Sequence, residues 1–302
     1  TKQITGLYPI SRLFMSYYNF PMYYGMGFYI VLSIVVFYLF VKIASLKYGL
    51  LNTLANTKSS YANDKVSYER KSVFFSLYQK ELGRFLSSYM AVLNAGLGVI
   101  LLCVFSICFL FNSVGQIGNS AGIENINEYL SNLAPVFIAS MLSLSCPAAS
   151  SISLEGKNIW ILKSSPVEVK TILNAKIAVN LTLHLIGYMI SVSVFMLKLD
   201  MNPIQVMNLV IVPICYSLFI MVIGISLNKK YPNYDWDSEM IVVKQSLPVI
   251  VTGIISMITL ITPILLNWFF NLPIIFVLQA VSVILLAISF RVYRKMTKLN
   301  FI

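Results

Sequence analysis

The sequence predicts an all-α integral membrane protein that crosses the bilayer several times. Of its 302 residues, 58% are apolar and only 11% are charged, whereas a soluble domain has about 45 to 50% apolar and about 25% charged residues. Six stretches contain no Asp, Glu, Lys or Arg, and each is longer than the ~20 residues that cross a bilayer as a helix. These stretches are residues 13–41, 85–123, 129–154, 177–197, 201–228 and 245–290.

The apolar stretches predict about seven transmembrane helices. The last stretch is long enough for two, because Asn267, Asn271 and Pro273 near its middle favour a tight turn. An odd number of spans places the two termini on opposite sides of the membrane. The expected spans are about 24–41, 90–111, 132–149, 177–197, 206–227, 246–266 and 272–290.

The distribution of Lys and Arg predicts the orientation of the chain. Short loops that are rich in these residues stay in the cytoplasm. We therefore expect the N-terminus outside and the C-terminus inside, and we interpret the net charge of +11 as a topology signal rather than a nucleic-acid site. Anionic lipid headgroups are then the expected partner of these charges. The basic segments, with 19 of the 22 Lys and Arg, are 42–89, 150–176, 228–245 and 291–302.

The first third of the chain predicts three successive parts. Residues 1–44 are expected to hold an external segment and the first span, and the Ser/Asn/Lys-rich run 45–72 is expected to be a cytoplasmic linker. Residues 73–89 have apolar side chains at three- and four-residue intervals, which predicts an amphipathic helix. We expect this helix to lie in the membrane interface, although a solvated extension of the next span is the alternative. Its charged side chains are Lys80, Glu81 and Arg84.

The cytoplasmic loop 152–176 predicts two elements. Its first half interleaves apolar and charged side chains but is too short to cross the bilayer, so it either lies at the headgroups or docks onto another protein. In its second half, Ser165, Pro166 and Glu168 match the N-cap, first-turn proline and capping-box glutamate of a helix that begins at Pro166.

The next cytoplasmic loop, residues 227–246, clusters acidic side chains around Trp236. Three carboxylates at alternate positions resemble a calcium loop, but the glycine and the distant glutamate of that loop are missing. A charged docking surface, or a helix N-terminus favoured by acidic residues, is the preferred interpretation. The charged residues of this loop are Asp235, Asp237, Glu239 and Lys244.

The predicted spans lack the residues of several membrane functions. His184 is their one ionisable group besides Cys and Tyr, so a carboxylate relay for ion coupling is missing. One histidine cannot build an H-E-x-x-H metal site, and neither a G-x-S-x-G motif nor a G-x-x-x-x-G-K-[ST] loop occurs. The four cysteines fall inside spans without metal-ligand spacing, so neither disulfides nor zinc are expected.

The order of these parts resembles a known family. An amphipathic helix (FFSLYQKELGRFLSS), a span, an external loop and a span precede the phrase ISLEGKNIWILKSSPV and four further spans. This order resembles the permease subunits of bacterial type-two ATP-binding-cassette (ABC) exporters. The phrase YPNYDWDSEMIVVKQS is similar to the long Firmicute-type permeases, which have two six-span halves. The resemblance covers residues 73–290, and residues 24–41 would then be the last span of a missing first half.

The resemblance implies a role for each cytoplasmic segment. Residues 73–302 would form a six-helix permease unit with the interfacial helix 73–89, and residues 152–163 would be the coupling helix that sits in a groove of the ATPase subunit. Ser165, Pro166 and Glu168 would form the rigid joint behind it. The docking residues implied are Glu155, Gly156, Lys157, Asn158, Trp160 and Lys163.

These observations predict the permease of an ABC exporter in a bacterial plasma membrane. The chain itself is expected to be no enzyme and to hold no cofactor, with ATP and magnesium bound by a separate ATPase subunit. A second permease unit and membrane lipids are the other expected partners. The uncharged spans favour an amphipathic substrate, and the candidates for its path are Asn94, Ser106, Ser140, Ser143, Ser145, His184 and Thr252.

Other functions remain as alternatives to this prediction. A secondary transporter or channel would drive flux with ion gradients alone. A membrane scaffold or immunity protein would bind a partner without nucleotide-dependent flux. A membrane enzyme is the least favoured, because no catalytic group of residues is recognisable.

Overall fold

The computed structural model describes residues 27, 30–43, 45–46, 72–112, 114 and 125–298, which form helices and connections with no strand among them. The chain divides into two compact units, residues 1–69 and 70–302. The first unit contains the apolar helix Ile30–Ile43, whose side chains are exposed. The predicted external segment 1–23 and nearly all of the linker 45–72 lie outside the described residues.

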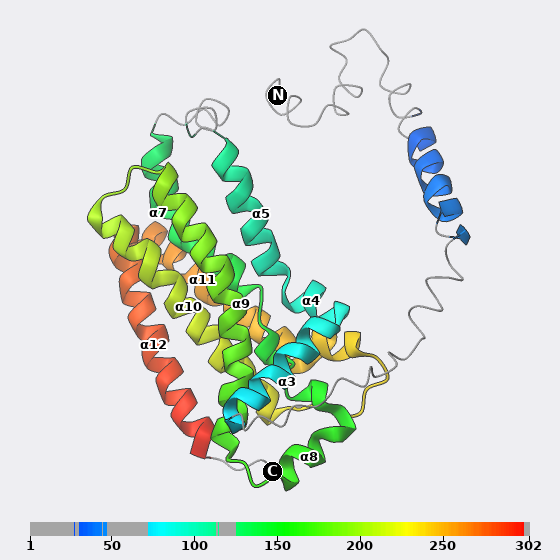
Figure 1. Cartoon of the computed structure of the whole chain (residues 1–302). Coiled ribbons are helices and arrows are strands. Elements are labelled where there is room, and N and C mark those ends of the chain that lie inside the picture. Colours follow the sequence, from blue (N-terminus) through cyan, green and yellow to red (C-terminus); the bar gives the residue numbers. More distant parts are fainter. Residues whose placement is uncertain are drawn as a thin grey trace. The chain divides into compact units, whose positions relative to one another are not determined.

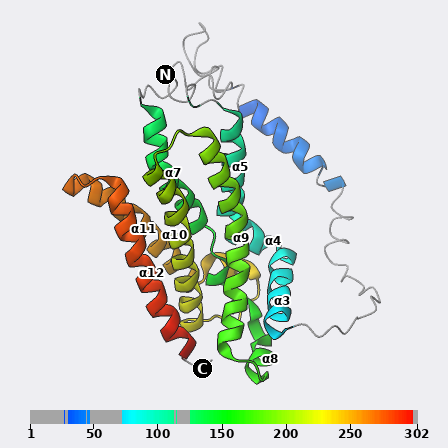
Figure 2. The ribbon, with the colours of Figure 1, turned by 60° about the vertical axis from the view of Figure 1, so that its left-hand side comes forward.

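The second unit is a helical bundle (Figure 1). The ends of α10 and α12, the start of α9, and the short helices α3 and α8 lie at one end of this bundle, as Figures 1 and 2 both show. Its elements are α3 (Val73–Ser87), α4 (Tyr89–Ala95), α5 (Leu97–Phe111), α7 (Ile126–Ser143), η3 (Pro147–Ala149), η4 (Ser153–Asn158), α8 (Ile159–Ser164), α9 (Val169–Lys198), α10 (Pro203–Lys230), η5 (Ile241–Gln245), α11 (Leu247–Phe270) and α12 (Ile274–Lys298).

The prediction of an all-helical membrane protein is confirmed. Five helical segments are long and apolar enough to cross a bilayer, and α4 with α5 makes a sixth if this bent pair is one span. The helix Ile30–Ile43 is apolar but shorter than these segments. Among the described residues the structure thus supports five or six full-length spans, where the sequence predicted seven. The five segments are Ile126–Ser164, Val169–Lys198, Pro203–Lys230, Ile241–Phe270 and Ile274–Lys298. The first of them comprises the apolar helix α7 and, after it, the short elements η3, η4 and α8.

The predicted span 90–111 is not one straight helix. The axes of α4 and α5 meet at an angle of 61° at Gly96. Here the hydroxyl of Ser145 donates a hydrogen bond to the carbonyl of Ala95, 2.5 Å away. A side chain that inserts into the backbone ladder beside a glycine is a common cause of a helix kink. The carbonyl of Met141 lies so close to Gly98 that a Cβ there would collide with it.

The predicted span 132–149 also ends early. Helix α7 stops at Ser143, and the chain continues through the buried 3-10 turn η3. Pro147 opens this turn and has no backbone N–H with which to continue an α-helix. The side chain of Asn180 on α9 fixes η3, because its Oδ1 accepts a hydrogen bond of 3.0 Å from the Ala148 amide.

The predicted helix start at Pro166 is wrong. Helix α9 begins at Val169, and its N-cap residue Glu168 makes no side-chain cap bond. Ser165 instead donates its hydroxyl proton to the carbonyl of Leu162, 2.9 Å away, and so closes α8. A serine side chain can bond backbone groups at either end of a helix. Here it bonds the last turn of the preceding helix, α8. Ser165 and Pro166 therefore lie in a short connection between α8 and α9.

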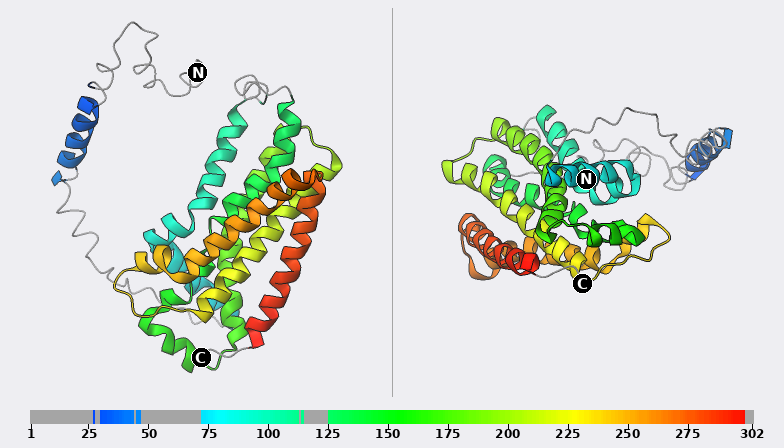
Figure 3. Two further views of the ribbon diagram at one scale, coloured as in Figure 1. Left: turned by 180° about the vertical axis from the view of Figure 1, so that it is seen from behind. Right: turned by 60° about the horizontal axis from the view of Figure 1, so that its bottom comes forward.

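Helix α10 forms the centre of the second unit. It packs against α7, α9, α11 and α12. Of its most apolar stretch of 18 residues, 67% is buried. For the segment that contains α11 the buried share is only 17%, and Figure 3 shows α11 on the outside of the bundle. The apolar face of α11 is therefore left to contact lipid or another protein.

Candidate functional site

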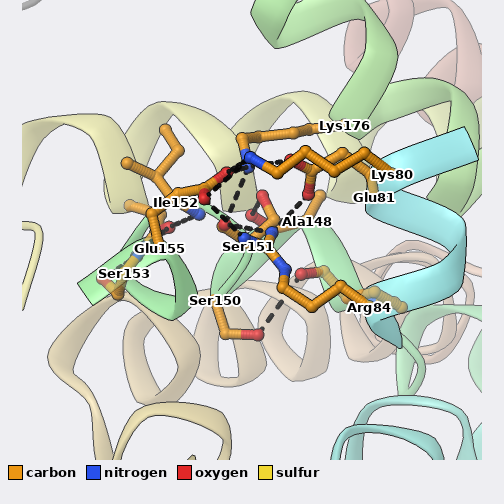
Figure 4. Close-up of polar contacts among 12 residues, drawn as sticks. Lys80, Glu81, Arg84, Ala148, Ser150, Ser151, Ile152, Ser153, Glu155 and Lys176 are labelled. Atoms are coloured by element: carbon orange, nitrogen blue, oxygen red, sulfur yellow. Dashed lines mark hydrogen bonds and ion pairs between the residues drawn. The ribbon is translucent and has the colours of Figure 1, made fainter. Parts of the chain in front are cut away.

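A buried ionic network joins α3, η4 and α9 (Figure 4). The ammonium group of Lys176 on α9 lies 2.8 Å from Oε1 of Glu81 and 2.8 Å from Oε1 of Glu155. It also donates to the carbonyl of Ser151, 3.0 Å away. The Lys176 side chain is fully buried, and those of both glutamates are 4% exposed. One lysine therefore connects the amphipathic helix α3 to the loop that precedes α8.

Two further cations complete the network. Arg84 places Nη1 2.9 Å from Oε2 of Glu155, and its Nη2 donates to the Ser151 carbonyl at 3.0 Å and pairs with Glu81. Lys80 lies 3.1 Å from Glu155 and is about half exposed. Glu155 thus forms ion pairs with three cations, which come from α3 and α9, two helices that are far apart in sequence.

The two glutamates of the network differ in their ionisation. Burial raises the pKa of the Glu81 carboxyl above its ordinary value, even though Lys176 and Arg84 act against it. Burial acts in the same direction on Glu155, but the charges of Lys176 and Arg84 outweigh it, so the pKa of Glu155 lies below its ordinary value. Glu155 therefore stays charged at neutral pH.

A second set of contacts holds the loop from its other side. Asn228, at the end of α10, accepts hydrogen bonds at Oδ1 from the amides of Ile152 and Ser153, at 2.7 and 3.1 Å. Its Nδ2 donates to the Ser153 hydroxyl at 2.7 Å. The indole N–H of Trp236 donates to the Ser153 carbonyl at 2.8 Å. The loop 227–246 therefore packs against the first loop and helps to hold it.

Gly156 allows this packing. Its φ of 55° is a left-handed conformation that glycine adopts without strain. A Cβ at this position would lie 3.2 Å from the Trp236 ring. Gly156 and Trp236 thus belong to the inner side of the loop, in contact with each other.

The outer side of the same loop is exposed. The Trp160 side chain is 64% exposed and that of Ile161 is 52% exposed, although α8 is held by the buried residues Ile159 and Leu162. Lys157 and Asp235 form a pair at 3.8 Å with both side chains in solvent. The other exposed polar residues here are Asn158, Lys163 and Ser164.

The remaining residues of the second loop lie in different places. Asp237 and Lys244 are exposed, whereas Glu239 accepts a hydrogen bond from the hydroxyl of Ser88 and so fixes the start of α4. Within the part of the chain that the structure describes, no group of three or more His, Cys, Asp or Glu is placed to hold a metal.

Most of the path candidates bond to their own helix. Ser106, Ser140 and Thr252 donate their hydroxyl protons to carbonyls three or four residues earlier, at 2.7, 2.7 and 2.6 Å. Asn94 does the same with its amide, at 2.9 Å from the Met90 carbonyl. Ser143 is buried. The side chains of Asn94, Ser106, Ser140 and Thr252 are thus hydrogen-bonded within their own helices.

His184 lies in a buried polar cluster between α9, α10 and the connection after α7. Its ring contacts Asn180 at 3.0 Å and Ser217 at 2.7 Å, and it also contacts the carbonyl of Ser145. The residue is 1% exposed. The cluster joins three elements, since Asn180 also binds η3.

Sequence reasoning missed Lys176 and Asn228, which hold the loop in place. Lys176 directly precedes the uncharged stretch 177–197 and was counted only among the loop cations. Asn228 closes the uncharged stretch 201–228. The available signal was their position, since polar side chains at the ends of apolar spans lie where loops pack back on the helices.

A family model described as "Putative ATP-binding cassette" matches residues 124–295. This range contains α7 through most of α12, including the loop residues Glu155 and Asn228. No curated protein and no solved structure matches the chain.

Two predictions from the sequence are contradicted by this family description. The chain was expected to be no enzyme, and to hold no cofactor because ATP and magnesium would be bound by another subunit. An ATP-binding-cassette description indicates ATP binding and ATPase-type activity, so both expectations are corrected. The described part of the matched range is helical, and no G-x-x-x-x-G-K-[ST] motif occurs in the sequence.

Proposed function

Because this chain belongs to the family described as "Putative ATP-binding cassette", we propose that it is the membrane-spanning permease unit of an ABC transport system. In this proposal the outer side of η4 and α8 contacts an ATP-hydrolysing subunit. The ionic network then transmits movement of that contact to α3 and α9.

The two-sided character of the loop 153–164 supports this proposal most directly. Its inner side is fixed to α3, α9 and α10 through Glu155 and Ser153, and Gly156 packs against Trp236. Its outer side offers Trp160 and Ile161 to solvent, flanked by Lys157 and Lys163. Exposed aromatic and aliphatic side chains with a charged rim are typical of protein interfaces. A movement can pass between two proteins only through an element that is fixed to one and in contact with the other.

Orientation and cargo follow from the same proposal. The loop and the basic ends of α10 and α12 lie at one end of the bundle, which the excess of Lys and Arg assigns to the cytoplasm. We place the chain in a bacterial plasma membrane, as a half that works with a second permease unit, because of its resemblance to the exporter permeases. The uncharged spans favour export of an amphipathic substrate over transport of an ion.

Copurification tests the proposed contact. The full chain is tagged, purified from its native membrane in mild detergent, and examined for a copurifying ATP-hydrolysing protein. We expect Lys157→Glu together with Trp160→Ala to reduce this protein at least tenfold, because both changes lie on the outer side. Lys170→Glu is the matched control, since Lys170 is exposed at the start of α9. Equal recovery in both variants, or no ATP-hydrolysing protein even after crosslinking, would contradict the proposed contact.

ATP binding by this chain itself is a second candidate function, and the family description favours it. The purified chain without other proteins is irradiated with a photoreactive ATP analogue, with and without excess ATP. Labelling that ATP suppresses would assign nucleotide binding to this chain, and peptide mapping would locate it. Transport driven by an ion gradient alone would instead support a secondary transporter.

A further inference from the structure

The cytoplasmic end of α12 carries a stripe of four cations on one exposed face. The positions follow the i, i+3, i+4, i+7 spacing of a single helix face, and all four side chains are exposed. The stripe consists of Arg291, Arg294, Lys295 and Lys298.

Within the part of the chain that the structure describes, no ion pair balances this stripe. Neither α10 nor α12 contains an acidic residue. The acidic residues Glu81 and Glu155 are buried in the network described above. The stripe is therefore a surface of unbalanced positive charge.

The helix end that bears the stripe is firmly held. On its opposite face, the carbonyl of Met296 accepts a hydrogen bond of 2.9 Å from Lys229 of α10. The hydroxyl of Tyr293 donates to Asn174 of α9 at 2.7 Å. The cations thus project from a backbone that is fixed on its far side.

The stripe continues an exposed apolar column along the same helix. Val283, Ile284 and Phe290 are 67%, 57% and 56% exposed, and they lie on the side of α12 that leads to the cations. The guanidinium of Arg294 lies over the Phe290 ring, 4.2 Å from its centroid, and so connects the two parts. At 1.5 Å per residue the stripe is roughly 10 Å long, which is comparable to the headgroup layer of a bilayer.

We propose that this stripe binds the phosphate headgroups of anionic phospholipids, with the lipid chains against the apolar column. Clusters of Lys and Arg next to a transmembrane helix attract anionic lipids, and here apolar surface and charge follow each other as they do along a phospholipid. An acidic protein partner would match the charge, but the apolar column belongs to the candidate membrane span Ile274–Lys298, where lipid chains are the surrounding surface. This site goes beyond the proposed transport role and does not depend on it.

The test compares two lipids with the same acyl chains. The melting temperature of the purified full chain in neutral detergent is measured while phosphatidylglycerol or phosphatidylcholine is added. A ligand that binds the folded state raises the melting temperature. We expect a larger rise with phosphatidylglycerol, and this excess should shrink as salt is added. An equal rise with both lipids would overturn the proposal.

Variants then locate the effect. In one variant all four cations of the stripe are changed to Gln. We expect the phosphatidylglycerol concentration that produces half of the excess rise in melting temperature to increase at least tenfold in this variant. The matched control removes the same charge by changing Lys157, Lys163, Lys170 and Lys244 to Gln, and it should respond as the wild type does. Arg291→Lys with Arg294→Lys should also keep the shift.

The opposite results are equally clear. An unchanged lipid response in the stripe variant, or equal loss in both four-residue variants, would overturn the proposal. Loss of a copurifying protein with an unchanged lipid response would assign the stripe to a protein partner and overturn it too. If the four-residue variant does not fold, the single changes Arg291→Gln and Lys298→Gln are used, each of which should weaken the response at least twofold.

Discussion

The Nζ of Lys176 lies 2.8 Å from Oε1 of Glu155, and this contact joins the first helical turns of α9 to the loop before α8. Glu155 also pairs with Arg84 and Lys80 of α3. Three segments of the chain therefore meet at one carboxylate. The proposed transmission of movement from the loop to the spans depends on these ion pairs.

Glu155→Gln should strongly destabilise the protein. The change removes the charge that balances buried Lys176 and the largely buried Arg84, and loss of one partner from a buried ionic group costs about 3–5 kcal/mol. The melting temperature of the purified chain measures this effect. Asp235→Asn is the control. The Asp235 side chain, which pairs with Lys157, is 92% exposed, so this change should leave the melting temperature unchanged. A similar effect of both changes would count against the network.

The network should also make stability depend on pH in two directions. The pKa of Glu155 is lowered in the folded state, so its stabilisation is present above its ordinary pKa of 4.5 and is lost as pH falls below that value. The pKa of Glu81 is raised, so its contribution is present below 4.5 and is lost as pH rises through its folded-state pKa. Glu81→Gln should therefore weaken the decline of melting temperature that accompanies a rise of pH from 4.5 through the folded-state pKa of Glu81. A profile identical to that of the wild type would contradict the raised pKa of Glu81.

Gly156→Ala should destabilise the loop. Gly156 combines a φ of 55° with a ψ of −139°, a backbone conformation that costs a non-glycine residue roughly 1–3 kcal/mol. The new Cβ would also press on the Trp236 ring at 3.2 Å. Melting temperature and tryptophan fluorescence report the change. Gly83→Ala serves as the control, because no atom lies within 4 Å of a Cβ there and alanine favours the helix. The control should be neutral or slightly stabilising, and a neutral Gly156→Ala would contradict the packing described.

Asn228→Ala should loosen the loop without touching its outer side. The amides of Ile152 and Ser153 would lose their acceptor, and a buried donor without a partner costs about 1–3 kcal/mol. Hydrogen exchange at these two amides should accelerate at least tenfold relative to the wild type. Asn158→Ala on the exposed side is the comparison and should leave both exchange rates as they are.

The elements of the fold were predictable to different degrees. Runs without charge predicted the apolar helices α9, α10, α11 and α12 closely, because burial in lipid constrains every residue of such a run. The early end of α7 before Pro147 has a local cause that a run of uncharged residues does not show. The bend at Gly96 depends on Ser145 reaching a carbonyl of another helix. The sequence pattern of one helix does not show a hydrogen bond between two helices, so the bend was not predicted.

The same reason explains the candidate site. Charged residues of the loop were recognised, but Glu155 was expected on a docking face together with Lys157, whereas the structure places Glu155 inside and Lys157 outside. Their spacing of two residues does not decide this, because the positive φ of Gly156 interrupts the helical geometry between them. The helix start at Pro166 failed similarly, since a serine serves either neighbouring helix.

The contacts of Glu155 have a consequence for synthesis of the chain at the ribosome. Arg84 is made before Glu155, whereas Lys176 follows it by 21 residues, which takes about 1–4 s at 5–20 residues per second. Asn228 follows Ile152 by 76 residues and arrives about 4–15 s after it. The loop therefore acquires its inner contacts in a fixed order, from α3, then α9, then α10. Until α10 has been translated, the amides of Ile152 and Ser153 depend on water, and the contact of Trp236 with Ser153 forms later still, because Trp236 follows α10 in the chain.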